Sequence, residues 1–273
     1  MGILNVTPDS FSERGTYFDR KAAIARGLEM EREGADILDI GGESTRPGAD
    51  PVPEEEEIDR TIPVIEALRR KGLKIPISID TYKSAVAERA LQAGAEIVND
   101  VSGLRYDPRL AAVVKKHRAA IVLMHLRGTP RTMQQLPPVR NIMSTVRGGL
   151  RVSLRRALAA GIPKRRIILD PGIGFGKTAA QNFELIRELA RIARMGYPLL
   201  AGPSRKFFIH KAIRELAAGQ KQLLVQRGAA PETVLFGTAT AVTAAILNGA
   251  HIVRVHDVRQ MLPVARLADR ILG

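Results

Sequence analysis

Short apolar runs alternate with longer amphipathic segments along the whole chain. Eight runs of three to five residues end at polar positions and predict buried parallel strands at 2–6, 36–40, 75–79, 96–98, 120–124, 166–169, 198–201 and 252–255. Segments with helical periodicity follow them, at 22–32, 58–71, 84–93, 109–117, 145–160, 182–195, 233–248 and 263–271. Eight consecutive strand–helix units favour a closed α/β fold, a (β/α)8 TIM barrel.

The junctions between these units indicate one domain. Several predicted helices end at a glycine directly before the next strand, as at Gly34, Gly94 and Gly249. No linker or change of composition divides the chain, so a single barrel domain over 1–273 is predicted. The alternative is a doubly wound open sheet. The segment 207–230 predicts an extra helix and loop after the seventh strand, and the long connections 41–57 and 124–140 are candidates for functional loops.

Composition excludes several classes of protein. Hydrophobic residues make up 45% and charged residues 26% of the 273, which is typical of a packed domain rather than a disordered chain. There is no cysteine, which excludes disulfides and thiolate metal sites. No apolar run approaches the roughly 18 residues of a membrane span, and no secretory signal precedes the first strand. We therefore expect a cytoplasmic protein without a membrane partner.

The net charge of +14 is unevenly distributed. Residues 127–169 contain ten Lys or Arg and no acidic residue. Such a run indicates either a surface for nucleic acid or a solvated helix face. Arg147, Arg151 and Arg155 recur every four residues, as they do along one side of a helix, and no aromatic residue interrupts the run. The helix face is favoured, and no nucleic-acid partner is expected.

Polar residues gather where the predicted strands end. In a barrel these positions meet at the face that carries the active site. Carboxylates and carboxamides there suit the nitrogens of a heterocycle, and cationic side chains suit a phosphate or carboxylate. A cap on the following helix is the structural alternative for any single one. The set is Asn5, Glu43, Asp80, Asn99, Asp100, His125, Asp170, Lys206, Arg254 and His256.

The glycine-rich segment 170–178 looks at first like a phosphate loop. It reads Asp-Pro-Gly-Ile-Gly-Phe-Gly-Lys-Thr, but Pro171 stands where a P-loop needs its first glycine. The glycine spacing also differs from that of a dinucleotide fingerprint. What remains is a tight turn that admits a flat ligand, or a simple strand-to-helix turn.

Seven ordered motifs resemble the dihydropteroate synthases, the sulfonamide-target enzymes of folate synthesis. The opening segment 1–12 is similar to their first signature, and Gly-Gly-Glu-Ser-Thr-Arg-Pro-Gly at 41–48 to their second. The others follow in the family order over nearly the whole chain, namely Ser-Ile-Asp-Thr at 78–81, Val-Asn-Asp-Val-Ser at 98–102, the turn 170–177, Ser-Arg-Lys at 204–206 and Arg-Val-His-Asp at 254–257.

The resemblance implies a transferase that joins 6-hydroxymethyl-7,8-dihydropterin pyrophosphate to 4-aminobenzoate, with Mg2+ as cofactor and a homodimer as its usual assembly. By the same resemblance four groups of residues are expected. The pterin would be bound by Asp80, Asn99, Met124, Asp170 and Lys206. The pyrophosphate would be bound by Asn5, Thr45, Arg254 and His256, with Asn5 also a metal ligand. The aminobenzoate would be bound by Arg46, Pro47, Phe175 and Lys206, and catalysis would rest on Asp170, Lys206, Arg254 and His256.

Two local departures from the family pattern stand out. The first loop reads Ser-Glu-Arg-Gly at 12–15 where the family has Ser-Asp-Gly-Gly, so Arg14 replaces a flexible glycine. Phe207 replaces a serine that meets the aminobenzoate carboxylate in many relatives, so another group must take that contact. The alternative function is a pterin-binding barrel of the methyltetrahydrofolate:corrinoid methyltransferase type. That class needs no pyrophosphate clamp, and Lys206, Arg254 and His256 argue against it.

Overall fold

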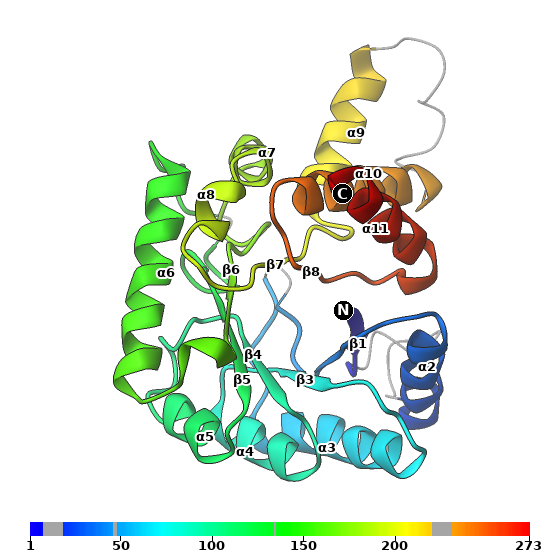
Figure 1. The fold of residues 1–273 in the computed structure, drawn as a ribbon, viewed down its shortest axis with the longest axis vertical. Helices are drawn as coiled ribbons and strands as arrows, with labels where there is room; N and C mark the ends of the chain where they lie inside the picture. The colour runs from blue at the N-terminus through cyan, green and yellow to red at the C-terminus, as the bar shows by residue number, and fades with distance from the viewer. Residues whose placement is uncertain (8–18, 46–47, 134, 220–230) are drawn as a thin grey trace.

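The computed structural model describes residues 1–7, 19–45, 48–133, 135–219 and 231–273 (Figure 1). Six strands form one parallel sheet in chain order, and two more pair with each other. The sheet contains β1 (Gly2–Asn5), β2 (Leu38–Gly41), β3 (Ile77–Asp80), β4 (Ile97–Asp100), β5 (Ala120–Met124) and β6 (Ile167–Asp170), and the pair is β7 (Leu200–Ala201) and β8 (Ile252–Val253).

Two parallel bridges join the pair to the sheet and close the ring. Leu169 bridges to Leu199 on one side, and Gly2 bridges to Val255 on the other. Backbone hydrogen bonds follow both junctions, from Leu169 N to Pro198 O at 2.9 Å and from Ile3 N to Val255 O at 3.0 Å. The predicted barrel is therefore confirmed. The open sheet is wrong, because the end of the eighth strand returns to pair with the first.

Helices surround the strands (Figure 1). They are α2 (Arg20–Arg32), α3 (Glu54–Arg70), α4 (Ser84–Gln92), α5 (Leu110–Lys116), α6 (Ile142–Ala159), α7 (Ala179–Arg187), α8 (Ala190–Ala193), α9 (Phe207–Gly219), α10 (Pro231–Leu247) and α11 (Val258–Leu272), with a 3-10 turn at Lys164–Arg166. No helix in these described ranges is long and apolar enough to cross a membrane.

Three of the predicted helices differ most from the observed ones. Helix α3 begins at Glu54, four residues before the predicted start at 58. The four glutamates of its first turn interact favourably with the positive end of the helix dipole and stabilise this extension. Helix α11 begins at Val258 and contains Pro263, which was expected to open it. The predicted helix 182–195 divides into α7 and α8.

The extra helix expected after the seventh strand is α9, which projects beyond the ring of helices (Figure 1). The predicted segment continues to residue 230, and 220–230 lie outside the described residues.

The core lies between the strands and the helix layer. Leu38, Ile40, Ile77, Ile79 and Ile121 are fully buried. Side chains on both faces of these strands are covered, since one face lines the barrel and the other meets helices. That is why the strands appear in the sequence as continuous apolar runs rather than alternating ones. Most polar residues of the strands therefore lie at the strand ends, and Asp39 and Ser78 are buried within strands.

Candidate active site

The carboxyl ends of the strands surround a cavity of about 530 Å3. The walls come from the end of β1, the loop after β2, the end of β3, the turn after β6 and the segments after β7 and β8. The structure brings together in this wall most of the residues that the sequence predicted, namely Asn5, Thr45, Asp80, Phe175, Lys206, Arg254 and His256.

Arg254 is held between two carboxylates from neighbouring strands. Its Nε donates to Asp39 Oδ2 at 2.6 Å, and its Nη2 donates to Asp80 Oδ2 at 2.8 Å. Burial raises the pKa of Asp80 to about 7, although Arg254 favours the ionised form. A planar guanidinium satisfied on one edge still presents other N–H groups to a ligand.

Asp39 is a site residue that the sequence analysis missed. It lies inside β2, has no exposed surface and also accepts from Asn99 Nδ2 at 3.1 Å. Asp39 fell within the predicted strand 36–40, and no role at the site was predicted for it. The available signal was the charge itself, because a carboxylate within a buried strand requires a partner.

Three almost fully buried residues beside the cavity are not part of its wall. Asn99 and Met124 are 4% and 3% exposed, and Asp170 is 6% exposed. Met124 packs in a cluster with Met133 and Phe175, both of which line the cavity. Asn99 Oδ1 and Asp39 Oδ1 are buried and have no hydrogen-bond partner among the described residues. Buried acceptors of this kind indicate a ligand or an ordered water.

Asp170 ends β6 and begins the glycine-rich turn. Its Oδ1 accepts from Gly172 N at 2.7 Å, which leaves Oδ2 without a partner in the described part of the chain. Burial raises the pKa of Asp170 to about 6, and the charges of Lys206, Lys177 and Arg254 oppose that rise. These three cations therefore favour the ionised form of this buried carboxyl.

Lys206 lies over the ring of Phe175, with Nζ 3.9 Å from the ring centroid. Burial and the charge of Arg254 lower the pKa of Lys206 to about 8. Gly174 adopts φ of +88°, and a Cβ there would lie 2.9 Å from Lys206 Cδ. This glycine is required both by its backbone conformation and by the passage of the lysine side chain.

Lys177 explains why the glycine-rich turn is not a phosphate loop. Its buried Nζ donates to the carbonyl oxygens of His125, Gly172 and Phe175 at 3.1, 2.7 and 2.9 Å. In a P-loop the backbone N–H groups surround a phosphate. Here backbone carbonyls surround the lysine of the same segment, so the turn is organised around its own cation.

His256 is neutral rather than cationic. Burial and the charge of Arg254 lower the pKa of His256 to about 3. Its Nδ1 lies 3.1 Å from Ser204 Oγ, so an anion would be bound by a neutral imidazole N–H. The positive charge near His256 comes from Arg254, Arg205 and Lys206.

Two strand-end residues from the sequence analysis have structural roles. Asp100 accepts from the N–H groups of Ser102 and Leu104 and so fixes its own turn. His125 is 8% exposed and packs against α6, where a Cβ on Gly149 would lie 2.5 Å from its ring. Neither residue lines the cavity.

Several predicted residues lie outside the described residues, namely Arg46, Pro47, Glu13 and Arg14. Asn5 lines the cavity, and its side chain has no hydrogen-bond partner within the described ranges. Across the same ranges no group of three or more His, Asp or Glu could hold a metal ion. His210, from the first turn of α9, lines the cavity and was not predicted.

The chain is similar to known proteins along its full length. A family model described as a pterin binding enzyme matches residues 1–256. The dihydropteroate synthase of Synechocystis is 46% identical over 99% of this chain and 89% of its own length. That of Bacillus subtilis is 43% identical over 100% and 88%.

Solved structures agree with these sequence matches. A dihydropteroate synthase from Clostridium difficile, determined with pteroic acid, superposes with a TM-score of 0.87 at 44% identity, over 99% of this chain and 95% of that one. The Xanthomonas albilineans enzyme with 4-aminobenzoic acid gives a TM-score of 0.86 at 42% identity, over 100% and 92%. The chain therefore belongs to the pterin-binding enzyme family, as a dihydropteroate synthase, a transferase of folate biosynthesis.

Proposed function

We propose that this cavity joins 6-hydroxymethyl-7,8-dihydropterin pyrophosphate to 4-aminobenzoate and releases pyrophosphate. The observation that carries the proposal is that buried acceptors and cationic side chains meet at one cavity. Asp39 Oδ1 and Asn99 Oδ1 are buried without a hydrogen-bond partner among the described residues, and Lys206 and Arg254 line the cavity wall. The pterin, whose ring nitrogens and amino group are donors, suits Asp80, Asn99 and Asp170. Lys206 and Met124 complete this subsite.

The pyrophosphate is assigned to the end of the cavity that carries Arg254, His256, Thr45 and Asn5. Arg254 supplies the charge, and the neutral imidazole and the hydroxyl supply hydrogen bonds. Asn5 fits a magnesium ion, because an amide oxygen without a protein partner is a ligand that this ion accepts beside phosphate oxygens. When bound, the ion would stabilise the negative charge of the leaving group.

The reaction requires no protein nucleophile. The bond between the pterin methylene carbon and the pyrophosphate oxygen breaks, and that oxygen keeps the electron pair. The amine nitrogen of aminobenzoate forms the new C–N bond and then loses a proton to solvent. Positive charge develops on the pterin meanwhile, and the carboxylates of Asp80 and Asp170 stabilise it. Arg254 stabilises the departing anion, and Lys206 keeps Phe175 and the pterin in place.

The aminobenzoate is assigned to the side of the cavity formed by Phe175 and Lys206. Arg46 and Pro47 lie outside the described residues, and their contact with the aminobenzoate stays a prediction. Phe207 offers no donor to its carboxylate. His210 lies one helical turn after Phe207, lines the same cavity and has no hydrogen-bond partner among the residues described. We assign the carboxylate contact to His210.

A His210→Ala variant will raise the KM for 4-aminobenzoate by about tenfold, the effect of losing one hydrogen bond to a charged group. The KM for the pterin substrate should change less than twofold, because the pterin is assigned to Asp80 and Asp170 and not to His210. Steady-state kinetics with each substrate varied in turn measure both values. His251→Ala is the matched control, since that histidine bonds the backbone N–H of Leu199 away from the cavity. An unchanged aminobenzoate KM in His210→Ala would remove the assignment.

The reaction itself is tested by measuring pyrophosphate release with both substrates and magnesium, with dihydropteroate identified by mass. Product that requires both substrates supports the proposal. Tight pterin binding without product would instead favour the corrinoid methyltransferase class or a binding protein.

We also propose that the chain acts as one domain over residues 1–273 in a cytoplasmic homodimer. Phe236, Leu247, Leu267 and Ile271 are exposed apolar residues on α10 and α11, which pack against each other. Exposed apolar residues on adjacent helices favour an interface with a second copy. Light scattering of the purified protein measures the assembly.

A further inference from the structure

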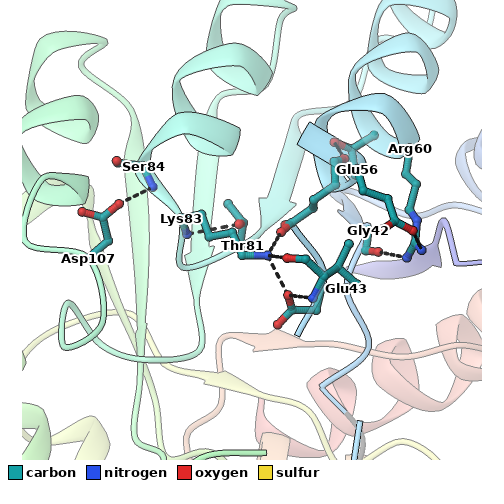
Figure 2. A network of polar contacts seen from close by, with 11 residues as sticks. Gly42, Glu43, Glu56, Arg60, Thr81, Lys83, Ser84 and Asp107 are labelled. Carbon is teal, nitrogen blue, oxygen red and sulfur yellow. Dashed lines mark hydrogen bonds and ion pairs between the residues drawn. The ribbon is translucent and has the colours of Figure 1, made fainter. Parts of the chain in front are cut away.

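A buried lysine behind the cavity joins the loop after β2 to two neighbouring elements. Lys83 Nζ donates to Glu43 Oε2 at 2.6 Å, to Val52 O at 2.6 Å and to Glu57 Oε2. Figure 2 shows the contact between Lys83 and Glu43 within this polar network. All three of its N–H donors are thereby used. We call Lys83, Glu43, Val52 and Glu57 the Lys83 network.

The network closes the loop at its base. Glu43 Oε2 also accepts from Val52 N at 2.9 Å, so residues 43 and 52 are joined twice. Glu43 and the two residues after it, Ser44 and Thr45, line the cavity. Lys83 does not line the cavity, but its contacts therefore fix the position of this part of the wall.

The same network extends to the strand that carries Asp80. Lys83 is the N-cap residue of α4, three positions after Asp80, and Glu57 belongs to the first turn of α3. The loop packs directly on α3, because a Cβ at Gly42 would lie 2.8 Å from Thr61 Cγ2 and 3.0 Å from Glu57 Cγ. The contacts thus place the loop relative to both α3 and β3.

The positive charge of Lys83 compensates two buried carboxylates. The side chains of Lys83, Glu43 and Glu57 are 10%, 7% and 1% exposed. Burial opposes the ammonium form, but Glu57 and Glu43 outweigh it and raise the pKa of Lys83. Without the ammonium, two carboxylates would share a buried space beside Thr45, and their charge would oppose an incoming pyrophosphate.

We propose that Lys83 is a positioning residue that holds the wall of Glu43, Ser44 and Thr45 in the arrangement that binds pyrophosphate. The inference rests on the proposed function, in which Thr45 binds this group. Buried ion pairs contribute little net stability compared with apolar packing, so fixing one conformation is the role that accounts for their presence here.

The test compares two ligands that differ only in the pyrophosphate. In a Lys83→Met variant, calorimetry should show the Kd of dihydropterin pyrophosphate raised about tenfold or more. The Kd of 6-hydroxymethyl-7,8-dihydropterin should change less than twofold. Lys83→Arg keeps the charge and should restore part of the affinity for the pyrophosphate ester. Lys116→Met is the matched control, since Lys116 pairs with Glu88 on the exposed surface, and neither Kd should change.

Equal weakening for both ligands, or no weakening, would overturn the inference, since a general loosening of the fold affects the pterin as well. Absence of product from the unaltered protein would instead remove the proposed function. The network can also be tested without a variant by amide hydrogen exchange. The Val52 N–H should exchange as slowly as the amides of β3, and exchange at the rate of an open loop would contradict the network.

Discussion

An Asp170→Asn variant will lose about 10²–10³-fold in kcat/KM while unfolding at a higher temperature than the unaltered protein. The loss of activity follows from removing a carboxylate that stabilises positive charge in the transition state. The gain in stability follows from burial. A carboxyl whose pKa rises from 3.8 to about 6 on folding destabilises the folded state by about 3 kcal/mol above pH 6. Asparagine bears no such charge and still accepts from Gly172.

The sign of the pH dependence provides a second check. Between pH 3.8 and about 6 the folded form of Asp170 binds more protons than the unfolded form. Stability therefore falls as pH rises through this window. The stabilising effect of Asp170→Asn should be present at pH 8 and disappear near pH 4, as measured by thermal unfolding.

Asp100→Asn is the matched control. Asp100 ends the neighbouring strand β4 and is also buried, but both of its oxygens accept from backbone N–H groups. An amide NH2 in place of one oxygen opposes a donor, so Asp100→Asn should lower the unfolding temperature and leave pterin affinity unchanged. A variant of Asp170 that lost stability and kept activity would contradict both assignments.

Arg254→Ala will abolish measurable dihydropteroate formation and lower the free energy of unfolding by about 3–5 kcal/mol. Activity is lost because the leaving pyrophosphate no longer meets a buried guanidinium. Stability is lost because Asp39 and Asp80 remain in the barrel without their shared cation. Urea unfolding and the pyrophosphate release assay measure the two effects separately.

A double-mutant cycle separates the role of Asp39 from that of Arg254. If Asp39 acts by holding Arg254, then Asp39→Asn should weaken the binding of dihydropterin pyrophosphate, measured by calorimetry, in the native background and have little further effect in Arg254→Ala. Additive losses of affinity would show that Asp39 contacts the substrate independently, through Oδ1, which has no hydrogen-bond partner among the described residues.

The sequence predicted the barrel and most of its cavity for one physical reason. Buried parallel strands are continuous apolar runs, so the first polar residue after each run marks the open end of the barrel. Asp80 and His256 directly follow predicted runs, Asn5 and Arg254 lie next to the last residue of theirs, and all four line the cavity.

The same rule also selected residues that do not belong to the cavity, because adjacent residues of a strand point to opposite faces. Asn99 reaches Asp39 inside the barrel, whereas Asp100 folds back on its own turn. Asp39 was missed because the apolar run continues past it to Ile40. Its partner Arg254 is 215 residues away, a pairing that no local pattern contains.

The two single bridges that close the barrel have a consequence for local unfolding. β7 and β8 pair over two residues each, whereas their counterparts in the larger sheet pair over three or four. Segments with few backbone hydrogen bonds open at lower free energy than the rest of a domain. Lys206 and Arg254 both follow these short strands. The cations that we propose to contact the substrates therefore follow the strands that we expect to open at the lowest free energy, whereas the buried acceptors belong to the more extensively paired sheet.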